Sequence, residues 1–384
     1  MENLENLFLH NNDIMSIKGM FLGLFNLKFL KVDVFSLCCA KPRSIYEVEC
    51  VAPQNTISSC EQLISVPVLS VVIWYMAFLA TFGNIVALIS NLTTFKDKAS
   101  IEYLILSFNL SIADLFMGIY LYVIAIVNLM YTGVYGFEDY KWRHSSVCTF
   151  AGILATMSSE ASALFVLLIT IDRLIAIKHP FYPNKRRWVI MLSVFSWALS
   201  ISISLFPILA MELLIFKDFY AQSPICVSLP LSVHRQSGWQ YSMIIFIGLN
   251  FIIFVGISIG QFLIILEVNK SGRKSQASNR RRREIALAKS VVAVVITDLL
   301  CWVPVGIIGM LTFYGIDISL EVYAWIIVLV LPVNSALNPI LYTLSAIIRD
   351  RGRRKVFESN MQRENKMLIN ENDRLKRLLK SSKY

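Results

Sequence analysis

The sequence predicts an all-α membrane protein: a seven-transmembrane-helix bundle with a short N-terminal leucine-rich-repeat stub and a C-terminal amphipathic helix. Of its 384 residues, 56% are hydrophobic and 16% are charged, and the mean hydropathy is +0.61. In a soluble domain about a quarter of the residues are charged. The apolar residues also gather into seven runs, each long enough to cross a hydrocarbon core. These runs cover residues 66–92, 101–130, 147–178, 188–211, 238–268, 286–314 and 320–345.

Basic residues concentrate in alternate connections between these runs, notably within 178–187, 270–283 and 349–355. The other connections carry charges of both signs. Lysine and arginine mark cytoplasmic loops, so we expect an extracellular N-terminus and a cytoplasmic C-terminus, which an odd number of spans also requires. The same distribution explains the net charge of +10, so this charge does not indicate a nucleic-acid-binding protein. The expected surroundings are therefore a lipid membrane, with the chain crossing the plasma membrane several times.

Residues 1–37 are expected to form partial extracellular leucine-rich repeats. The pattern L-x-x-L-x-L-x-x-N-x-I starts at Leu4, and its first three apolar positions recur 23 residues later, at Leu27, Leu30 and Val32. That interval lies within the range of about 20–29 residues for such repeats. Since about three repeats are needed to bury a solenoid core, the segment is interpreted as the stub of a longer ectodomain or the result of a misassigned start.

A cysteine-containing hinge is expected at 38–65, followed by the membrane domain at 66–345 and by an amphipathic helix and cytoplasmic tail at 346–384. The hinge cysteines are Cys38, Cys39, Cys50 and Cys60. Four cysteines allow three pairings, and the sequence does not choose among them.

Polar and ionisable residues recur within the apolar runs, where lipid disfavours them. One such group alone can be a hydrogen bond between helices. The whole set instead predicts a functional core, and it comprises Asn84, Asp114, Glu160, Ser162, Asp172, Arg173, Trp197, Asp298, Trp302, Pro304, Asn334, Asn338, Pro339 and Tyr342.

This set resembles the rhodopsin-like (class A) family of G-protein-coupled receptors. The resemblance rests on Asp172-Arg173, on Cys-Trp-x-Pro at 301–304 and on Asn-Pro-x-x-Tyr at 338–342. Within that family, the segments around Cys60 and at 331–344 resemble the leucine-rich-repeat receptors, which include the glycoprotein hormone and relaxin-family peptide receptors. Trp302 favours the relaxin-type branch.

The resemblance implies a role for each group of residues. The activation switch and G-protein coupling would involve Asp172, Arg173, Asp298, Trp302, Pro304, Asn338, Pro339 and Tyr342. An allosteric sodium ion would bind at Asp114, Ser162, Asn334 and Asn338, with no other metal and no cofactor. Cys148 would pair with Cys226. The implied partners are a heterotrimeric G protein and a peptide hormone of relaxin or insulin-like type, with cyclic AMP as the modulated messenger.

Two alternatives remain open beside a signalling receptor. A truncated, non-signalling partner of a full-length receptor would also carry a short ectodomain. A membrane transporter would also bury acidic residues, although the sequence contains no inverted repeat. An enzyme is not expected, because none of the four histidines lies within an apolar run.

Overall fold

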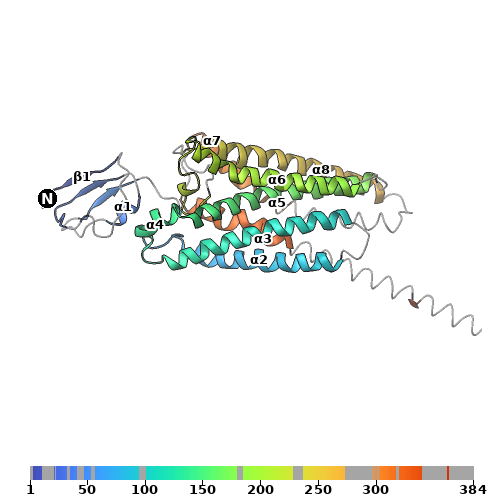
Figure 1. Ribbon diagram of the computed structural model, residues 1–384, viewed down its shortest axis with the longest axis horizontal. Coiled ribbons are helices and arrows are strands. Elements are labelled where there is room, and N and C mark those ends of the chain that lie inside the picture. Colours follow the sequence, from blue (N-terminus) through green and yellow to red (C-terminus); the bar gives the residue numbers. More distant parts are fainter. Residues whose placement is uncertain are drawn as a thin grey trace, which may run out of the picture.

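In the part of the chain that the computed structural model describes, five long helices lie side by side and a small sheet lies beyond one end of them (Figure 1). The described residues are 3–10, 21, 23–32, 35–40, 47–52, 57–94, 101–179, 185–227, 237–272, 296, 299–300, 302–316, 320–339 and 361–362. Asp298, Cys301, Tyr342 and the predicted C-terminal amphipathic helix lie outside these residues, and of the predicted cytoplasmic tail only 361–362 are described.

The long helices begin and end close to the predicted apolar runs. They are α2 (Pro67–Thr94), α3 (Ile101–Met130), α5 (Ser146–Lys178), α6 (Lys185–Glu212) and α8 (Asn250–Gly272), the last preceded by α7 (Trp239–Ser242) and the π-helical turn η2 (Met243–Leu249). By length and composition, four described helices could each cross a membrane: Pro67–Thr93, Ile101–Met130, Lys185–Glu212 and Trp239–Glu267. Shorter apolar helices cover Trp302–Phe313 and Val328–Pro339, the latter after α10 (Leu320–Trp325) and overlapping the π-helical turn η3 (Ile326–Val330).

Helix α5 lies at the centre of the bundle, where it packs against α3, α6 and α8. Its buried face includes Phe165 and Val166, both 0% exposed. The outer helices instead present large apolar side chains on their exposed faces, including Phe78, Phe82, Phe195 and Phe251. Such a surface suits contact with lipid acyl chains, because in water it would be an aggregation hazard.

The sheet has three parallel strands, β1 (Asn6–Phe8), β2 (Phe29–Lys31) and β3 (Glu49–Val51), in the order β1-β2-β3. Its register places Leu7 opposite Leu30 and Leu30 opposite Cys50. Leu27, Leu30 and Leu37 are 0–1% exposed in the small core beneath it, the last from α1 (Phe35–Cys39). Strand β3 comes from the predicted hinge, so the sheet continues beyond residue 37.

A short helix, α4 (Tyr135–Arg143), joins α3 to α5 at the end of the bundle nearest the sheet (Figure 1). The sequence analysis treated this stretch as a mixed-charge loop. Disulfides Cys38–Cys50 and Cys39–Cys60 brace the segment that lies against α4. The amide of Gly136 donates to the Cys60 carbonyl over 2.9 Å. A side-chain carbon at Gly136 would lie 2.6 Å from Cys39 Cβ, so this close approach requires glycine.

Candidate functional site

A buried carboxylate, Asp114 of α3, ties three helices together in the middle of the bundle. Its Oδ1 accepts hydrogen bonds from Ser162 Oγ of α5 at 2.8 Å and from Ser335 Oγ at 3.0 Å. Its Oδ2 accepts from Asn338 Nδ2 at 2.9 Å. Both Asp114 and Asn338 are 0% exposed. The geometry therefore places a carboxylate, two hydroxyls and an amide around one point.

Two of the residues predicted for this cluster, Ser162 and Asn338, bond directly to Asp114. Asn334 is buried in the same helix as Asn338. The structure adds Ser335, which was not among the residues predicted for this cluster. Residues three apart share a helix face, so Ser335 could have been found by its spacing from Asn338.

Oxygen atoms dominate this cluster, as a hard cation requires. Among the described residues, Asn338 Oδ1 is buried without a hydrogen-bond partner. Together with the Asp114 carboxylate and the Ser162 and Ser335 hydroxyls, this oxygen could ligate a sodium ion. The residues present therefore fit the predicted cation.

The cluster is also linked to the first long helix. Asn84 of α2 donates through Nδ2 to the Ser335 carbonyl over 3.0 Å. Gly83, next to it, allows close approach of the last described helix, because a side-chain carbon there would lie 2.9 Å from Pro339 Cγ. Trp197 of α6 is bonded separately, from Nε1 to Asn109 Oδ1 at 2.9 Å. Helices α2, α3 and α6 are thus each held by a polar contact.

A second buried charge cluster lies near the far end of α5. Arg173 donates to Asp172 Oδ2 through Nε at 2.9 Å and also through Nη2. The Arg173 side chain is 1% exposed, and its Cζ lies 4.9 Å from the Tyr103 ring centroid, a cation–π distance. Lys185 Nζ of α6 lies 2.8 Å from Asp172 Oδ1.

Asp172 therefore forms ion pairs with two cations, Arg173 and Lys185. Only Arg173 was predicted from the sequence as a site residue. Lys185 was interpreted as one of several loop charges, because nothing in its own sequence context indicates a partner. Buried charges of opposite sign hold a geometry strongly when each has hydrogen bonds. This cluster holds the Arg173 side chain in place at the end of α5.

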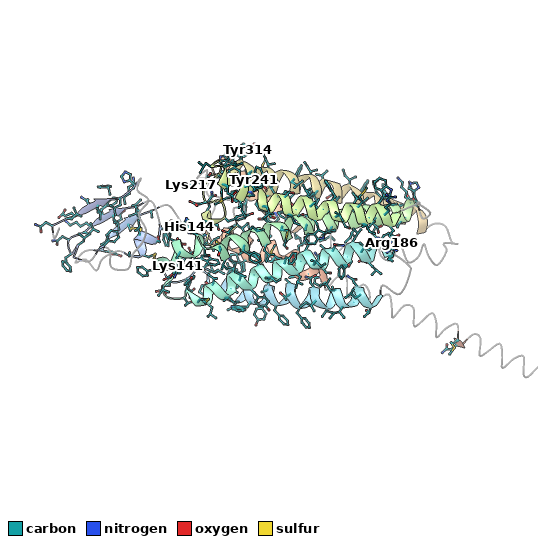
Figure 2. All side chains as sticks on the ribbon, viewed as in Figure 1. Lys141, His144, Arg186, Lys217, Tyr241 and Tyr314 are labelled. Atoms are coloured by element: carbon teal, nitrogen blue, oxygen red, sulfur yellow. A yellow bond between two sulfur atoms is a disulfide. The ribbon has the colours of Figure 1, made fainter. Side chains whose placement is uncertain are left out.

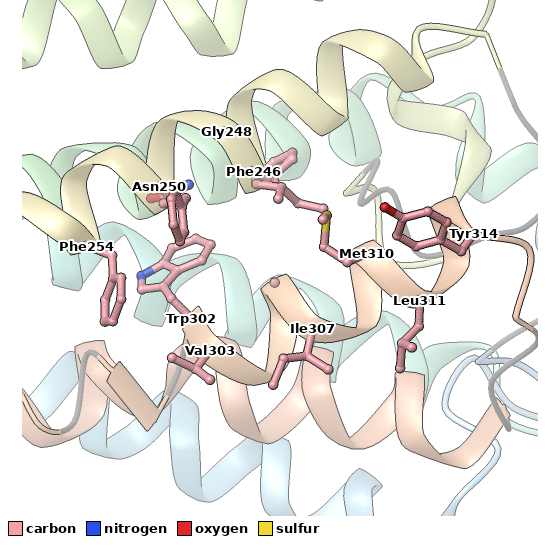
Figure 3. Close-up of a pocket in the computed structure, with 13 residues that line it drawn as sticks. Phe246, Gly248, Asn250, Phe254, Trp302, Val303, Ile307, Met310, Leu311 and Tyr314 are labelled. Atoms are coloured by element: carbon pink, nitrogen blue, oxygen red, sulfur yellow. The ribbon is translucent and has the colours of Figure 1, made fainter.

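A cleft of about 570 Å³ separates η2 and α8 from the helix Trp302–Phe313 (Figure 3). Trp302 and Phe246 line it from opposite sides, and Asn250 adds a polar group beside the tryptophan. Asn250 Nδ2 donates to Glu160 Oε1 of α5 over 3.0 Å. Pro304 lies in the first turn of the described part of this helix.

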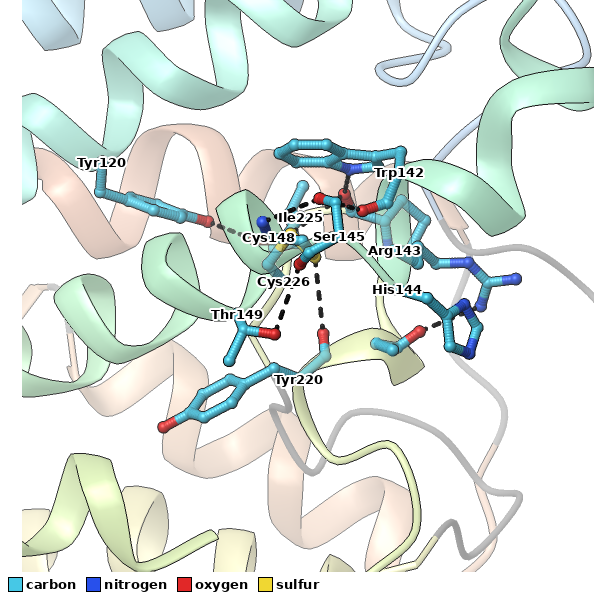
Figure 4. Close-up of a disulfide and its surroundings, with 12 residues drawn as sticks. Tyr120, Trp142, Arg143, His144, Ser145, Cys148, Thr149, Tyr220, Ile225 and Cys226 are labelled. Atoms are coloured by element: carbon cyan, nitrogen blue, oxygen red, sulfur yellow. Dashed lines mark hydrogen bonds between the residues drawn. A yellow bond between two sulfur atoms is a disulfide. The ribbon is translucent and has the colours of Figure 1, made fainter. Parts of the chain in front are cut away.

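The loop after α6 lies at the end of the bundle nearest the sheet, where Figure 2 labels Lys217, and it passes beside the start of α5 (Figure 4). Cys148, at the start of α5, and Cys226 of this loop form a disulfide with an S–S distance of 2.02 Å. Tyr120 donates from its hydroxyl to the Ile225 carbonyl at 3.0 Å, and Trp142 Nε1 donates to the Pro224 carbonyl at 2.7 Å. Ile225 is 1% exposed. The described part of this loop, residues 213–227, therefore packs against α3, α4 and the start of α5.

Helix α4 carries its own charged network next to this loop. Asp139 accepts hydrogen bonds from the Tyr135 hydroxyl at 2.7 Å and from Arg143 Nη2 at 2.6 Å. Arg143 Nη1 reaches the Ala221 carbonyl at 3.3 Å. Burial, with a further contribution from the Asp139 carboxylate, raises the pKa of Tyr135 well above its ordinary value. The network joins α4 to the loop after α6.

Comparison with known proteins gives one family and several relatives. Residues 83–342 match the family of 7 transmembrane receptors (rhodopsin family). The G-protein coupled receptor GRL101 of Lymnaea stagnalis is 38% identical over 329 residues, which are 85% of this chain and 29% of that protein. Relaxin receptor 1 of Mus musculus is 31% identical over 327 residues, 84% of this chain and 42% of that protein. The follicle-stimulating hormone receptor of Homo sapiens is 29% identical over 330 residues, 83% of this chain and 44% of that protein. The chain thus spans less than half the length of each of these relatives.

Proposed function

Because this chain belongs to the rhodopsin family of seven-transmembrane receptors, we propose that it couples an extracellular peptide or protein hormone of relaxin type to a heterotrimeric G protein. The family consists of multi-pass membrane receptors and not of enzymes. Two of the relatives are named for hormones, relaxin and follicle-stimulating hormone. Cyclic AMP is the second messenger that we expect to change.

The observation that carries this proposal is the buried Asp172–Arg173 pair. An arginine that is 1% exposed at the end of the central helix has no evident catalytic or transport task. In the proposed resting state Asp172 restrains it, and in the active state it would contact the G protein. The mechanism is a population shift between two helix packings.

The remaining switch residues have proposed parts in this repacking. Pro304 removes a backbone hydrogen bond and gives its helix a hinge. Trp302 lines the cleft beside that hinge and would respond to its closure or opening. Asp298, Asn338, Pro339 and Tyr342 complete the proposed switch, and a sodium ion at Asp114 would favour the resting packing.

The proposed domain organisation follows the sequence prediction, with partial leucine-rich repeats at 1–37, a cysteine-containing hinge at 38–65, a receptor domain at 66–345 and an amphipathic helix and tail at 346–384. The parallel pairing of Leu7 with Leu30 supports the repeat interpretation. The proposed orientation has the N-terminus outside the cell and the C-terminus inside.

The proposal can be tested by measuring cyclic AMP, without hormone, in cells that express the full chain. The Arg173→Ala variant is measured beside the wild type. We expect a basal change in cyclic AMP that the variant abolishes while its surface level stays the same. Lys141→Ala, which removes an exposed cation at the opposite end of the bundle, serves as a control and should keep the signal (Figure 2). A signal that survives Arg173→Ala would contradict the mechanism. Silence of the wild type at full surface level would favour the alternative, a non-signalling partner.

A further inference from the structure

A groove of about 200 Å³ lies between α3, α5 and α6, near the helix ends that point away from the sheet. Its walls are mainly apolar and include Leu106 of α3, Leu168 and Ile171 of α5, and Trp188 and Leu192 of α6. Trp188 is 50% exposed and Ile171 is 41% exposed. Because the chain belongs to a membrane-spanning family, this opening faces the acyl chains of the bilayer.

The polar end of the groove carries an excess of positive charge. Asp172 and Lys185 both line it, with Lys185 Nζ at 2.8 Å from Asp172 Oδ1. Arg173 already neutralises the other oxygen of that carboxylate. Two cations and one anion therefore leave one positive charge over, and Lys185 is the cation nearer the surface, because its side chain is 18% exposed against 1% for Arg173.

Two further cations follow Lys185 in the same turn of α6. Arg186 and Arg187 are exposed, and Figure 2 shows Arg186 at the end of the bundle far from the sheet. The N-terminus of a helix carries a partial positive charge, so three consecutive cations in the first turn destabilise α6. An anion at this position would remove that penalty.

We propose that this groove binds an anionic phospholipid. One acyl chain lies along Trp188 and Ile171, and the phosphate contacts Lys185. The choice of a lipid over a soluble anion follows from the geometry, since Lys185 lies at the polar end of an apolar groove that opens to the bilayer. The cytoplasmic leaflet, which is rich in anionic lipid, is the expected source. Only this choice of leaflet rests on the proposed orientation of the receptor.

The test uses the full chain in nanodiscs of phosphatidylcholine and phosphatidylserine, with bromine on the acyl chains of one lipid at a time. Bromine quenches tryptophan, and subtracting the signal of Trp188→Phe isolates Trp188. We expect phosphatidylserine to be enriched about five-fold over phosphatidylcholine beside Trp188, the factor for one basic residue near an anionic lipid.

Lys185→Gln should reduce this enrichment towards one, and Lys185→Arg should preserve it. Lys141→Gln changes the net charge equally at the opposite end of the bundle and should leave the enrichment unchanged (Figure 2). The Lys185→Arg variant also guards against a folding defect, because it keeps the charge.

Several outcomes would overturn the proposal. Equal quenching by both brominated lipids in the wild type would mean that the groove is an ordinary lipid-facing surface. Enrichment that persists in Lys185→Gln would remove Lys185 from the site. If adding glycerol phosphate to phosphatidylcholine discs gave a saturable change in Trp188 fluorescence, the cationic site would bind a soluble anion. If a brominated sterol quenched Trp188 more strongly than either phospholipid, the groove would be a sterol site. None of these readouts depends on signalling, so failure of the lipid site and failure of the receptor mechanism are distinguishable.

Discussion

Two buried carboxylates in this protein are compensated in different ways. Asp172 lies between Arg173 and Lys185 and forms ion pairs with both. Asp114, which is also buried, accepts hydrogen bonds from two hydroxyls and one amide, which are neutral groups. A buried charge without a counter-charge is costly. Asp114 therefore has the stronger need for a bound cation.

We predict that sodium stabilises the purified receptor through Asp114. Binding at ten times the dissociation constant contributes about 1.4 kcal/mol, which raises the melting temperature of a chain of this size by roughly 2 °C. Melting temperatures would be measured in sodium chloride and in choline chloride at the same ionic strength. Asp114→Asn should remove the difference, whereas Asp139→Asn, outside the bundle core, should keep it. An equal sodium effect in Asp114→Asn would place the ion elsewhere.

Ser335 provides a second test of the sodium site, because its hydroxyl donates a hydrogen bond to Asp114 and its oxygen can also ligate the ion. Loss of a hydrogen bond to a charged group costs about 1.5–3 kcal/mol. Ser335→Ala should therefore lower the melting temperature in choline as well as reduce the sodium effect. That double effect distinguishes a ligand from a residue that only fills space.

At the scale of single elements, α4 connects three parts of the chain. Gly136 contacts the Cys39–Cys60 segment, Phe137 packs against the core of the small sheet, and Trp142 bonds to the loop after α6. Asn128, just before α4, accepts from the Ile64 amide at 2.9 Å. A movement of the hinge would therefore displace α4 and the loop together.

We predict that Gly136→Leu loosens the hinge. Overpacking of this kind typically costs about 1–3 kcal/mol, and here the added side chain collides with Cys39. Hydrogen exchange of residues 57–66, followed by mass spectrometry, should become faster. Gly306→Ala is a suitable control, because a side-chain carbon there meets nothing within 4 Å. Unchanged exchange in Gly136→Leu would show that α4 does not hold the hinge.

The sequence predicted the long helices well and the contacts between them only in part. The run 101–130 coincides with α3, since a long apolar run can end only near the membrane surface. Helix α4 was missed because nine mixed-charge residues carry no such signal. Ser335 and Lys185 were missed for a related reason: their partners, Asp114 and Asp172, lie on other helices, and only the packing reveals which polar residues meet. Asp298 and Tyr342 remain predictions.

At the scale of the whole molecule, two independent features divide the bundle into opposite ends. The disulfides among the described residues, Cys38–Cys50, Cys39–Cys60 and Cys148–Cys226, lie towards the sheet, and disulfides persist in oxidising surroundings. The basic turn at the start of α6 lies at the other end, and basic residues favour the cytoplasmic side. Both features support the proposed orientation, in which the sheet is outside the cell.

We predict that an epitope tag at the N-terminus binds antibody on intact cells and that a tag at the C-terminus binds only after the membrane is permeabilised. The reason is that disulfides favour the oxidising, extracellular side, whereas the basic turn of α6 favours the cytoplasmic side. After mild reduction, a membrane-impermeant maleimide should label Cys39 and Cys60 from outside. Replacing both by serine provides the control for that labelling. Staining of the C-terminal tag on intact cells would contradict this orientation. It would also exclude the cytoplasmic leaflet as the source of the lipid proposed at Lys185. The preference for an anionic headgroup measured in nanodiscs would still hold.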